Sequence, residues 1–331
     1  MQMSSLYPLK FTPVIKEKVW GGTRLKTLLG KDFAPLSNCG ESWELSGLEG
    51  SESIVSNGFL AGNTINELAE VYMGDLVGDR VYGDHGISFP LLFKFLDTSQ
   101  PLSIQVHPGD AIARERHNCS GKAEMWYVLD AAPEAELLLG FSKDTDPPEY
   151  LHHLQNQTLD KLLRSEKVKP GDVFYIPPGQ VHGIGAGITL CEIQQSSDIT
   201  YRLYDWGRGV EAGKARKLHT EEAMDVIDFS AGNQRVSYSE NLNHPVELVK
   251  SPAFTTRLLS FDSDLESDYV FVDSFVVYMC IRGSASIAYP GGKEKLKAGE
   301  TMLLPAELNG VTLIPDGLCS LLETYLPSPD A

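Results

Sequence analysis

The stretch Lys169-Pro-Gly-Asp-Val-Phe-Tyr-Ile-Pro-Pro-Gly-Gln-Val-His182-Gly183 occurs twice in the chain, the second time in looser form. The second copy is Lys297-Ala-Gly-Glu-Thr-Met-Leu-Leu-Pro-Ala-Glu-Leu-Asn309-Gly310. Each copy has a turn at Gly-Asp or Gly-Glu, then an apolar run, then a proline that ends a strand. An aromatic and aliphatic strand precedes each copy, at 125–130 and 278–283. This repeat predicts a duplicated β-barrel, although Lys-x-Gly-Asp/Glu alone is also a common hairpin turn.

The rest of the chain favours strands over helices. Short runs rich in β-branched and aromatic residues are separated by Gly and Pro. They predict strands at 89–96, 102–106, 125–129, 137–141, 173–176, 188–194 and 201–204. Helices are expected from the capping box at 64–67 towards Met73, over 149–164 with five leucines roughly on one side, and after Thr220. The fold class is therefore mainly β, with two barrels and a few short helices.

The length of 331 residues suits two domains, each with its own core. We expect N-terminal strands and a short helical segment over 1–84, packed on the barrels. A first barrel follows over 85–205, and a polar helical connection over 206–235 leads to a second barrel over 236–331.

Composition excludes several classes of partner. The net charge of −17 disfavours nucleic acid and anionic membranes, since either would favour a basic face. The five cysteines are scattered and form no Cys-x-x-Cys pair, which suggests reduced thiols in a cytoplasmic protein. The first ten residues contain no apolar signal segment, and no run approaches the roughly 18 apolar residues of a membrane span. We therefore expect a cytoplasmic protein, and an anionic small substrate would need positive charge gathered locally.

Four residues have the spacing of a metal site. Alternate side chains of a strand share a face, so Gln105 and His107 point the same way. Glu124 lies on the next strand, and His182 follows the Pro-Pro-Gly turn at the end of a third. A barrel would bring these strand ends together. Two imidazoles, a carboxylate and an amide oxygen suit Zn²⁺ and also tolerate Mn, Co, Ni or Fe.

The second copy of the repeat lacks these groups. Asn309 stands where the first copy has His182, and Val276 aligns with Glu124. The strand framework is therefore kept in both halves, while the candidate ligands occur only in the first. We expect the first barrel to carry the chemistry and the second to be structural.

Several segments carry a family resemblance: 20–22, 40–44, 89–94, 102–108, 121–127, 177–183 and 192–208. The combination of Leu102-Ser-Ile-Gln-Val-His-Pro108 with Lys122-Ala-Glu124 is highly specific. In these segments the chain closely resembles type I phosphomannose isomerases in their short bacterial form, which are zinc-dependent cupin enzymes. The resemblance implies cupin-like (jelly-roll) barrels, one Zn²⁺ per chain on the four residues above, and reversible conversion of mannose 6-phosphate to fructose 6-phosphate. The second barrel lies outside the specific motifs.

The resemblance also implies an active site near Lys122, Glu192 and Arg202. The isomerisation moves a proton between C1 and C2 through an enediol-like intermediate. Glu192 is the candidate base, and Lys122 would either donate to an oxyanion or take part in the proton relay. Arg202 would hold two substrate oxygens with its planar fork.

The remaining candidates concern the substrate. Lys94, Ser103 and Arg208 are assigned to the phosphate end, where ordinary surface ion pairs are the alternative for the two cations. Asp198 would hold Arg202, and Trp20 would wall the cleft, although packing explains either equally well.

Rival functions remain open because a fold does not fix a function. Related barrels host iron oxygenases and sugar epimerases, but oxygenases use shells richer in histidine than one containing Gln105. A non-catalytic sugar-phosphate-binding protein would keep Arg202 without needing Lys122 and Glu192 at the metal. The expected partner is a small sugar phosphate, and the expected state is a monomer or weak homodimer.

Overall fold

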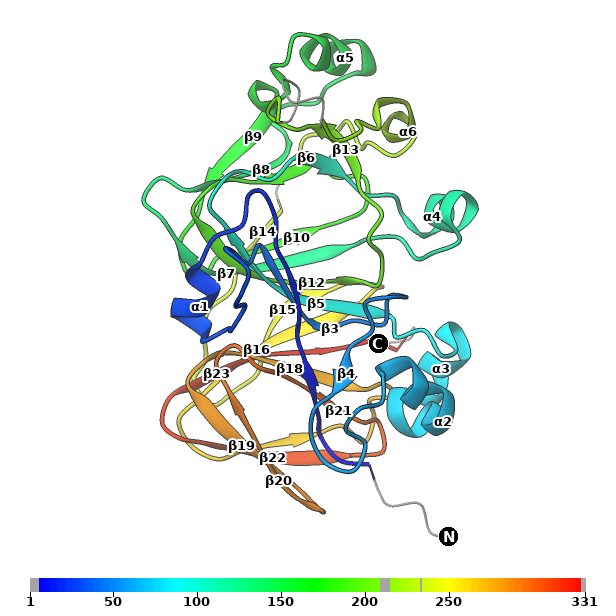
Figure 1. Cartoon of the computed structure of the whole chain (residues 1–331), viewed down its shortest axis with the longest axis vertical. Coiled ribbons are helices and arrows are strands. Elements are labelled where there is room, and N and C mark those ends of the chain that lie inside the picture. The colour runs from blue at the N-terminus through cyan, green and yellow to red at the C-terminus, as the bar shows by residue number, and fades with distance from the viewer. Residues whose placement is uncertain (1–5, 209–214, 233, 329–331) are drawn as a thin grey trace.

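A computed structural model describes residues 6–208, 215–232 and 234–328. In these ranges the chain is mainly β, as predicted, and its strands form four antiparallel sheets. Figure 1 shows the sheets stacked as layers along the long axis of the molecule. No helix in the described ranges is long and apolar enough to cross a membrane.

The first half of the stack contains a seven-stranded and a five-stranded sheet. The larger sheet has the order β14 (Arg235–Val236), β10 (Val173–Ile176), β7 (Glu124–Ala131), β12 (Ile188–Gln195), β5 (Leu91–Thr98), β3 (Glu41–Leu45) and β2 (Val14–Lys16). The smaller has the order β13 (Tyr201–Tyr204), β6 (Ile104–Val106), β11 (His182–Ile184), β8 (Glu136–Phe141) and β9 (Leu163–Lys167).

The second half has a matching pair of sheets. The larger runs β15 (Val246–Lys250), β16 (Thr255–Phe261), β23 (Cys319–Tyr325), β18 (Val276–Arg282), β21 (Thr301–Leu304), β1 (Leu9–Thr12) and β4 (Ile54–Val55). The smaller runs β17 (Leu265–Asp268), β22 (Gly310–Pro315), β19 (Ser284–Tyr289) and β20 (Gly292–Lys297).

The same strand order is therefore used twice. The run β10-β7-β12-β5-β3 of the first half corresponds to β21-β18-β23-β16-β15 of the second, and β6-β11-β8-β9 corresponds to β17-β22-β19-β20. The repeated sequence stretches supply equivalent strands, β10 and β21, at equivalent places. The N-terminal strands complete both large sheets, because β1 pairs with β21 and β2 pairs with β3.

Three of the four apolar cores in the described residues hold the sheets together. One lies between the two sheets of the first half, where Trp126 and Phe174 meet Leu137 and Leu139. Another fills the second half. A third joins the two large sheets back to back and includes Phe93 from β5 and Val277 from β18. Strands such as β5 and β12 are consequently buried on both faces.

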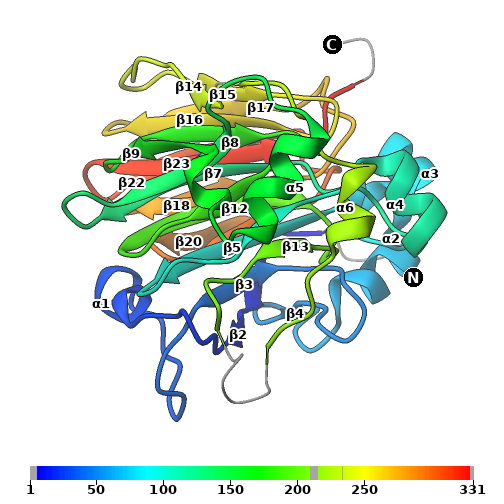
Figure 2. The same cartoon turned by 90° about the horizontal axis from the view of Figure 1, so that it is seen from above.

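Helices cover the ends and the outer face of the stack. They are α1 (Arg24–Leu29), α2 (Ile65–Val77), α3 (Asp79–His85), α4 (Asp110–His117), α5 (Pro147–Gln155) and α6 (Thr220–Met224). In Figure 2, α2, α3 and α4 lie at one end of the strands and α1 at the opposite end. The predicted capping box opens α2, with the Thr64 side chain and Glu67 bonding each other's backbone N–H.

The helix predicted over 149–164 is wrong in its second half. α5 ends at Gln155, and Gln157 adopts a left-handed φ of 55°. A short 3₁₀ turn (Leu159–Lys161) and strand β9 follow. The leucines at the end of this segment are buried between the small sheet and α5 instead of continuing a helix face. Of the connection expected over 206–235, the described part contains α6, β14 and loops, while 209–214 and 233 lie outside the described residues.

Candidate metal centre and active site

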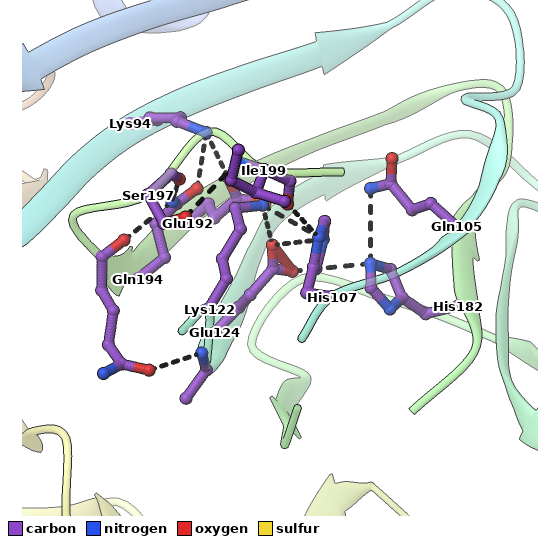
Figure 3. A network of polar contacts seen from close by, with 12 residues as sticks. Lys94, Gln105, His107, Lys122, Glu124, His182, Glu192, Gln194, Ser197 and Ile199 are labelled. Atoms are coloured by element: carbon purple, nitrogen blue, oxygen red, sulfur yellow. Dashed lines mark hydrogen bonds and ion pairs between the residues drawn. The ribbon is translucent and has the colours of Figure 1, made fainter. Parts of the chain in front are cut away.

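The predicted ligands come from both sheets of the first half. Gln105 lies on β6 with His107 just beyond its end, and His182 begins β11 directly opposite Gln105. Glu124 begins β7 in the facing sheet. Figure 3 shows the four side chains converging between the sheets. The structure thus brings together all four residues that the sequence proposed.

Three of these residues form a compact buried group. The candidate ligand atoms of His107, Glu124 and His182 lie within 4.8 Å of one another, and all three side chains are buried. Nε2 of His107 is 3.2 Å from Oε1 of Glu124, and Nε2 of His182 is 3.6 Å from its Oε2. Glu124 Oε2 has no hydrogen-bond partner among the described residues. A buried carboxylate oxygen without a donor is costly, and a cation would satisfy it.

Backbone carbonyls orient both imidazoles. Nδ1 of His107 lies 2.8 Å from the carbonyl oxygen of Ile199, and Nδ1 of His182 lies 2.9 Å from that of Gln180. Each Nδ1 therefore carries the proton, so each Nε2 presents a lone pair to the centre of the group. Burial, followed by the charge of Lys122, lowers the pKa of His107 to about 3. Burial also lowers the pKa of His182. Both rings are consequently neutral, as metal ligands must be.

Gln105 and Glu124 complete an N₂O₂ donor set. The side-chain amide of Gln105 places Nε2 3.3 Å from Nε2 of His182. The two ends of an amide exchange by a flip, which would turn Oε1 of Gln105 to the same point. Burial alone would raise the pKa of Glu124, but Lys122 and His107 hold it well below the usual range. The residues therefore fit a divalent cation.

Lys122 lies against the ligand atoms themselves. Its buried Nζ is 3.1 Å from Nε2 of His107 and donates to Oε1 of Glu124. The ammonium thus occupies part of the space beside the group and compensates the carboxylate charge. It is placed to meet a substrate oxygen bound next to a metal.

Glu192 is held by donors on both oxygens. Nζ of Lys94 donates to Oε1 at 2.8 Å, and the indole Nε1 of Trp126 donates to Oε2 at 2.9 Å. Lys94 also donates to Oε1 of Gln194 at 2.6 Å. Burial alone would lower the pKa of Lys94, but Glu192 and Glu41 raise it. Lys94, a candidate for the phosphate end, is therefore buried in an ion pair with the candidate base (Figure 3).

Arginines gather at the edge strand of the small sheet. Arg202 lies on β13 opposite Gln105, and its Nε has no partner among the described residues. Burial and then Arg216 lower its pKa. Asp205 accepts hydrogen bonds from Nε of Arg208 at 3.1 Å and Nε of Arg216 at 2.8 Å. The cluster of three arginines and one aspartate carries a net positive charge, and its member Arg202 lies next to the candidate ligand Gln105.

The other predicted substrate contacts vary in position. Ser103 is buried just before β6. Trp20 is buried in the core of the first half. Asp198 is exposed, and no hydrogen bond joins it to Arg202 in the described part of the chain, where Arg202 instead donates to the carbonyl of Lys217 at 3.2 Å.

Known proteins are similar to this chain in sequence. The model of the type I phosphomannose isomerase catalytic domain matches residues 8–141. The mannose-6-phosphate isomerase ManA of Bacillus subtilis is 43% identical over 235 residues, covering 69% of this chain and 70% of that protein. The probable mannose-6-phosphate isomerase GmuF of the same organism is 34% identical, covering 96% of this chain and 99% of that protein. The chain belongs to the type I phosphomannose isomerase family.

The fold agrees with the family. A crystal structure of the mannose 6-phosphate isomerase from Bacillus subtilis superposes with a TM-score of 0.85 at 33% identity, covering 96% of this chain and 99% of that one. A putative mannosephosphate isomerase from Archaeoglobus fulgidus, at 20% identity, shares the fold with a TM-score of 0.78.

Sequence reasoning missed three residues at this phosphomannose isomerase site. Trp126 bonds Glu192, Arg216 bonds Asp205, and Glu41 accepts from Nε1 of Trp43 at 2.6 Å. Burial alone would raise the pKa of Glu41, but Lys94 and Lys18 lower it. Trp126 follows Glu124 by two positions on one strand. Because alternate side chains of a strand share a face, this spacing could have placed Trp126 on the side of the site. Nothing in the sequence placed Arg216 beside Asp205.

Proposed function

We propose that this member of the type I phosphomannose isomerase family interconverts mannose 6-phosphate and fructose 6-phosphate, with Zn²⁺ bound by Gln105, His107, Glu124 and His182. The observation that carries the proposal is the buried group of two neutral imidazoles and one carboxylate, in a chain that is similar to a probable mannose-6-phosphate isomerase over 96% of its length. We assign this chemistry to a barrel over 85–205 and a structural role to a second barrel over 236–331.

The chain's own residues supply the proton transfer. A bound divalent ion would polarise the oxygens on C1 and C2. Glu192 removes the proton from C2 of the aldose and returns it to C1, which leaves the ketose. Lys122, beside the ligand atoms, exchanges the proton between the two oxygens or stabilises the negative charge on them. Both side chains are buried, which limits the access of bulk water to the transferred proton.

The phosphate end is assigned to the arginine cluster of Arg202, Arg208 and Arg216. Arg202 has a buried Nε that a substrate oxygen would satisfy. Guanidinium groups bind phosphate oxygens in pairs, which suits a dianion. Ser103 lies close in sequence to Gln105 and remains a candidate contact. Lys94 is assigned to Glu192 instead, because it is buried in an ion pair with a carboxylate of its own, whereas Arg208 and Arg216 share the single carboxylate of Asp205.

A coupled assay of the purified protein with mannose 6-phosphate tests the proposal. Activity should disappear on chelation and return with Zn²⁺, and mass spectrometry should find one zinc per chain. Undiminished activity at near-zero metal content would contradict the metal-dependent mechanism. Tightly held iron with oxygen consumption would favour the oxygenase alternative, and sugar-phosphate binding without turnover would favour a non-catalytic binding protein.

A further inference from the structure

The carboxylate of Glu192 is held by two donors of different stiffness. Lys94 reaches Oε1 through a flexible four-carbon stem, whereas Trp126 reaches Oε2 through a rigid indole. The indole is fully buried and packs edge-on against the ring of His182, with 5.5 Å between ring centroids and an interplanar angle of 73°. The direction of the indole N–H is consequently fixed by packing.

The second half of the molecule repeats this row without the metal ligands. Glu192 lies in register between Trp126 and Lys94, and Glu323 lies in register between Tyr278 and Arg257. Arg257 donates to one oxygen of Glu323, as Lys94 does to Glu192. A row of aromatic residue, buried carboxylate and cation across three strands therefore also occurs in the half whose described residues contain no metal-ligand group.

The two rows differ in how the aromatic residue meets the carboxylate. In the second half the hydroxyl of Tyr278 bonds that of Tyr269, and Tyr269 donates to Oε1 of Glu323 at 2.5 Å. In the first half Trp126 donates to Glu192 directly. The direct donor is thus found in the half that holds the metal group, on the carboxylate assigned as the base.

We propose that Trp126 is a positioning residue for proton transfer, an inference that rests on the assignment of Glu192 as the base. The terminal torsion of a glutamate is broad, so a carboxylate held at one oxygen would still rotate. The indole N–H fixes the second oxygen, and the remaining lone pairs keep one direction towards the substrate. Misalignment of a reacting group lowers the rate of the chemical step more than it lowers binding.

The test removes the indole N–H and preserves the shape. Incorporation of 3-benzothienylalanine at position 126 replaces N–H by sulfur in a ring of nearly the same size. Loss of a hydrogen bond to a charged group would lower the rate roughly 10–100-fold, so kcat should fall by about that factor. KM for mannose 6-phosphate should stay within about twofold and the zinc content unchanged, because substrate binding and metal ligation are assigned to other residues. With C2-deuterated substrate, the isotope effect on kcat should rise or stay large.

Two further variants keep the outcomes distinct. Tyr278→Phe removes the polar hydrogen from the equivalent row and should lower Tm without changing kcat. Glu192→Gln tests the base itself. If Glu192→Gln retains wild-type turnover, the base assignment is wrong. If Glu192→Gln is inactive while the benzothienyl variant keeps wild-type kcat and isotope effect, the base assignment stands and the inference about Trp126 is overturned.

Discussion

Nε2 of His107 lies 3.2 Å from Oε1 of Glu124, although the strands that carry these residues belong to different sheets. The five-stranded sheet ends its strand β6 just before His107, and the seven-stranded sheet begins β7 with Glu124. The metal group therefore spans the space between the two layers of the first half. A bound ion would connect them by direct bonds.

Metal binding should consequently stabilise the folded protein as well as activate it. A ligand that binds only the folded state adds about 2.7 kcal/mol at a concentration 100 times its Kd. Differential scanning calorimetry with and without saturating Zn²⁺ measures the shift in Tm. The chelated protein should melt several degrees lower, and equal melting temperatures at full zinc occupancy would contradict a bond across the sheets.

Replacing His182 by Asn should separate metal binding from folding. Asn309 occupies the corresponding place in the second half, just before β22, so the scaffold accepts this residue. His182→Asn should lose zinc and activity together while keeping a native circular dichroism spectrum. Full zinc content in this variant would remove His182 from the ligand set.

Lys122→Met should leave the metal bound and lower turnover. The ammonium contacts Nε2 of His107 and Oε1 of Glu124, the atoms a metal needs, so its loss should not weaken zinc binding. If Lys122 exchanges a proton or stabilises an oxyanion, kcat should fall roughly 10²–10⁴-fold. Lys122→Arg is the matched control: recovery of activity there points to charge stabilisation, and inactivity points to proton relay. Wild-type turnover in Lys122→Met excludes both roles.

The metal-free protein should lose stability as the pH falls below about 6.5, the usual pKa of histidine. Burial lowers the folded-state pKa of His107 to about 3 and lowers that of His182. Below pH 6.5 these two histidines bind protons in the unfolded chain but stay neutral in the folded chain. Acid therefore favours unfolding. Glu124, whose pKa is held well below its usual 4.5, adds a further loss at lower pH.

Urea unfolding between pH 7 and pH 4 measures how the free energy of unfolding depends on pH. His107→Asn should flatten the curve over the same range, because it removes one of the two buried imidazoles. An unchanged slope in that variant would show that other groups govern the acid sensitivity.

Arg257→Met should weaken the second half without altering chemistry. Arg257 is partly exposed and pairs with the fully buried Glu323, and the loss of this donor to a buried carboxylate costs about 1–3 kcal/mol. The midpoint of chemical denaturation should fall while kcat per folded molecule stays at the wild-type value. A loss of kcat at full zinc occupancy would mean that the second half takes part in catalysis.

Much of the fold followed from local patterns. The strands around Gln105, Glu124 and Glu192 were predicted to within about two residues, because β-branched runs end at Gly and Pro. The error after Gln155 has a physical cause. Leucines three and four apart look the same whether a helix or a buried turn and strand places them in a core, and the left-handed conformation of Gln157 ends the helix without a Gly or Pro.

The site was predictable where one strand supplied several residues and less so where strands meet. Alternation placed Gln105 beside His107, and the candidate ligands His107, Glu124 and His182 lie close together as expected. Lys94 was expected at the phosphate end, and its pairing with Glu192 was not predicted, because only the pairing of β5 with β12 brings the two residues together. That register is a long-range property, which no single strand sequence encodes.

The shared core between the two large sheets has a genetic consequence. Phe93 and Ile193 pack into it from the strands that carry Lys94 and Glu192. A substitution in the second half that loosens this core would lower the amount of folded enzyme in the cell. Each molecule that still folds would keep its normal kcat. The effect of such substitutions would grow with temperature, and they would lie far from the residues assigned to the sugar phosphate.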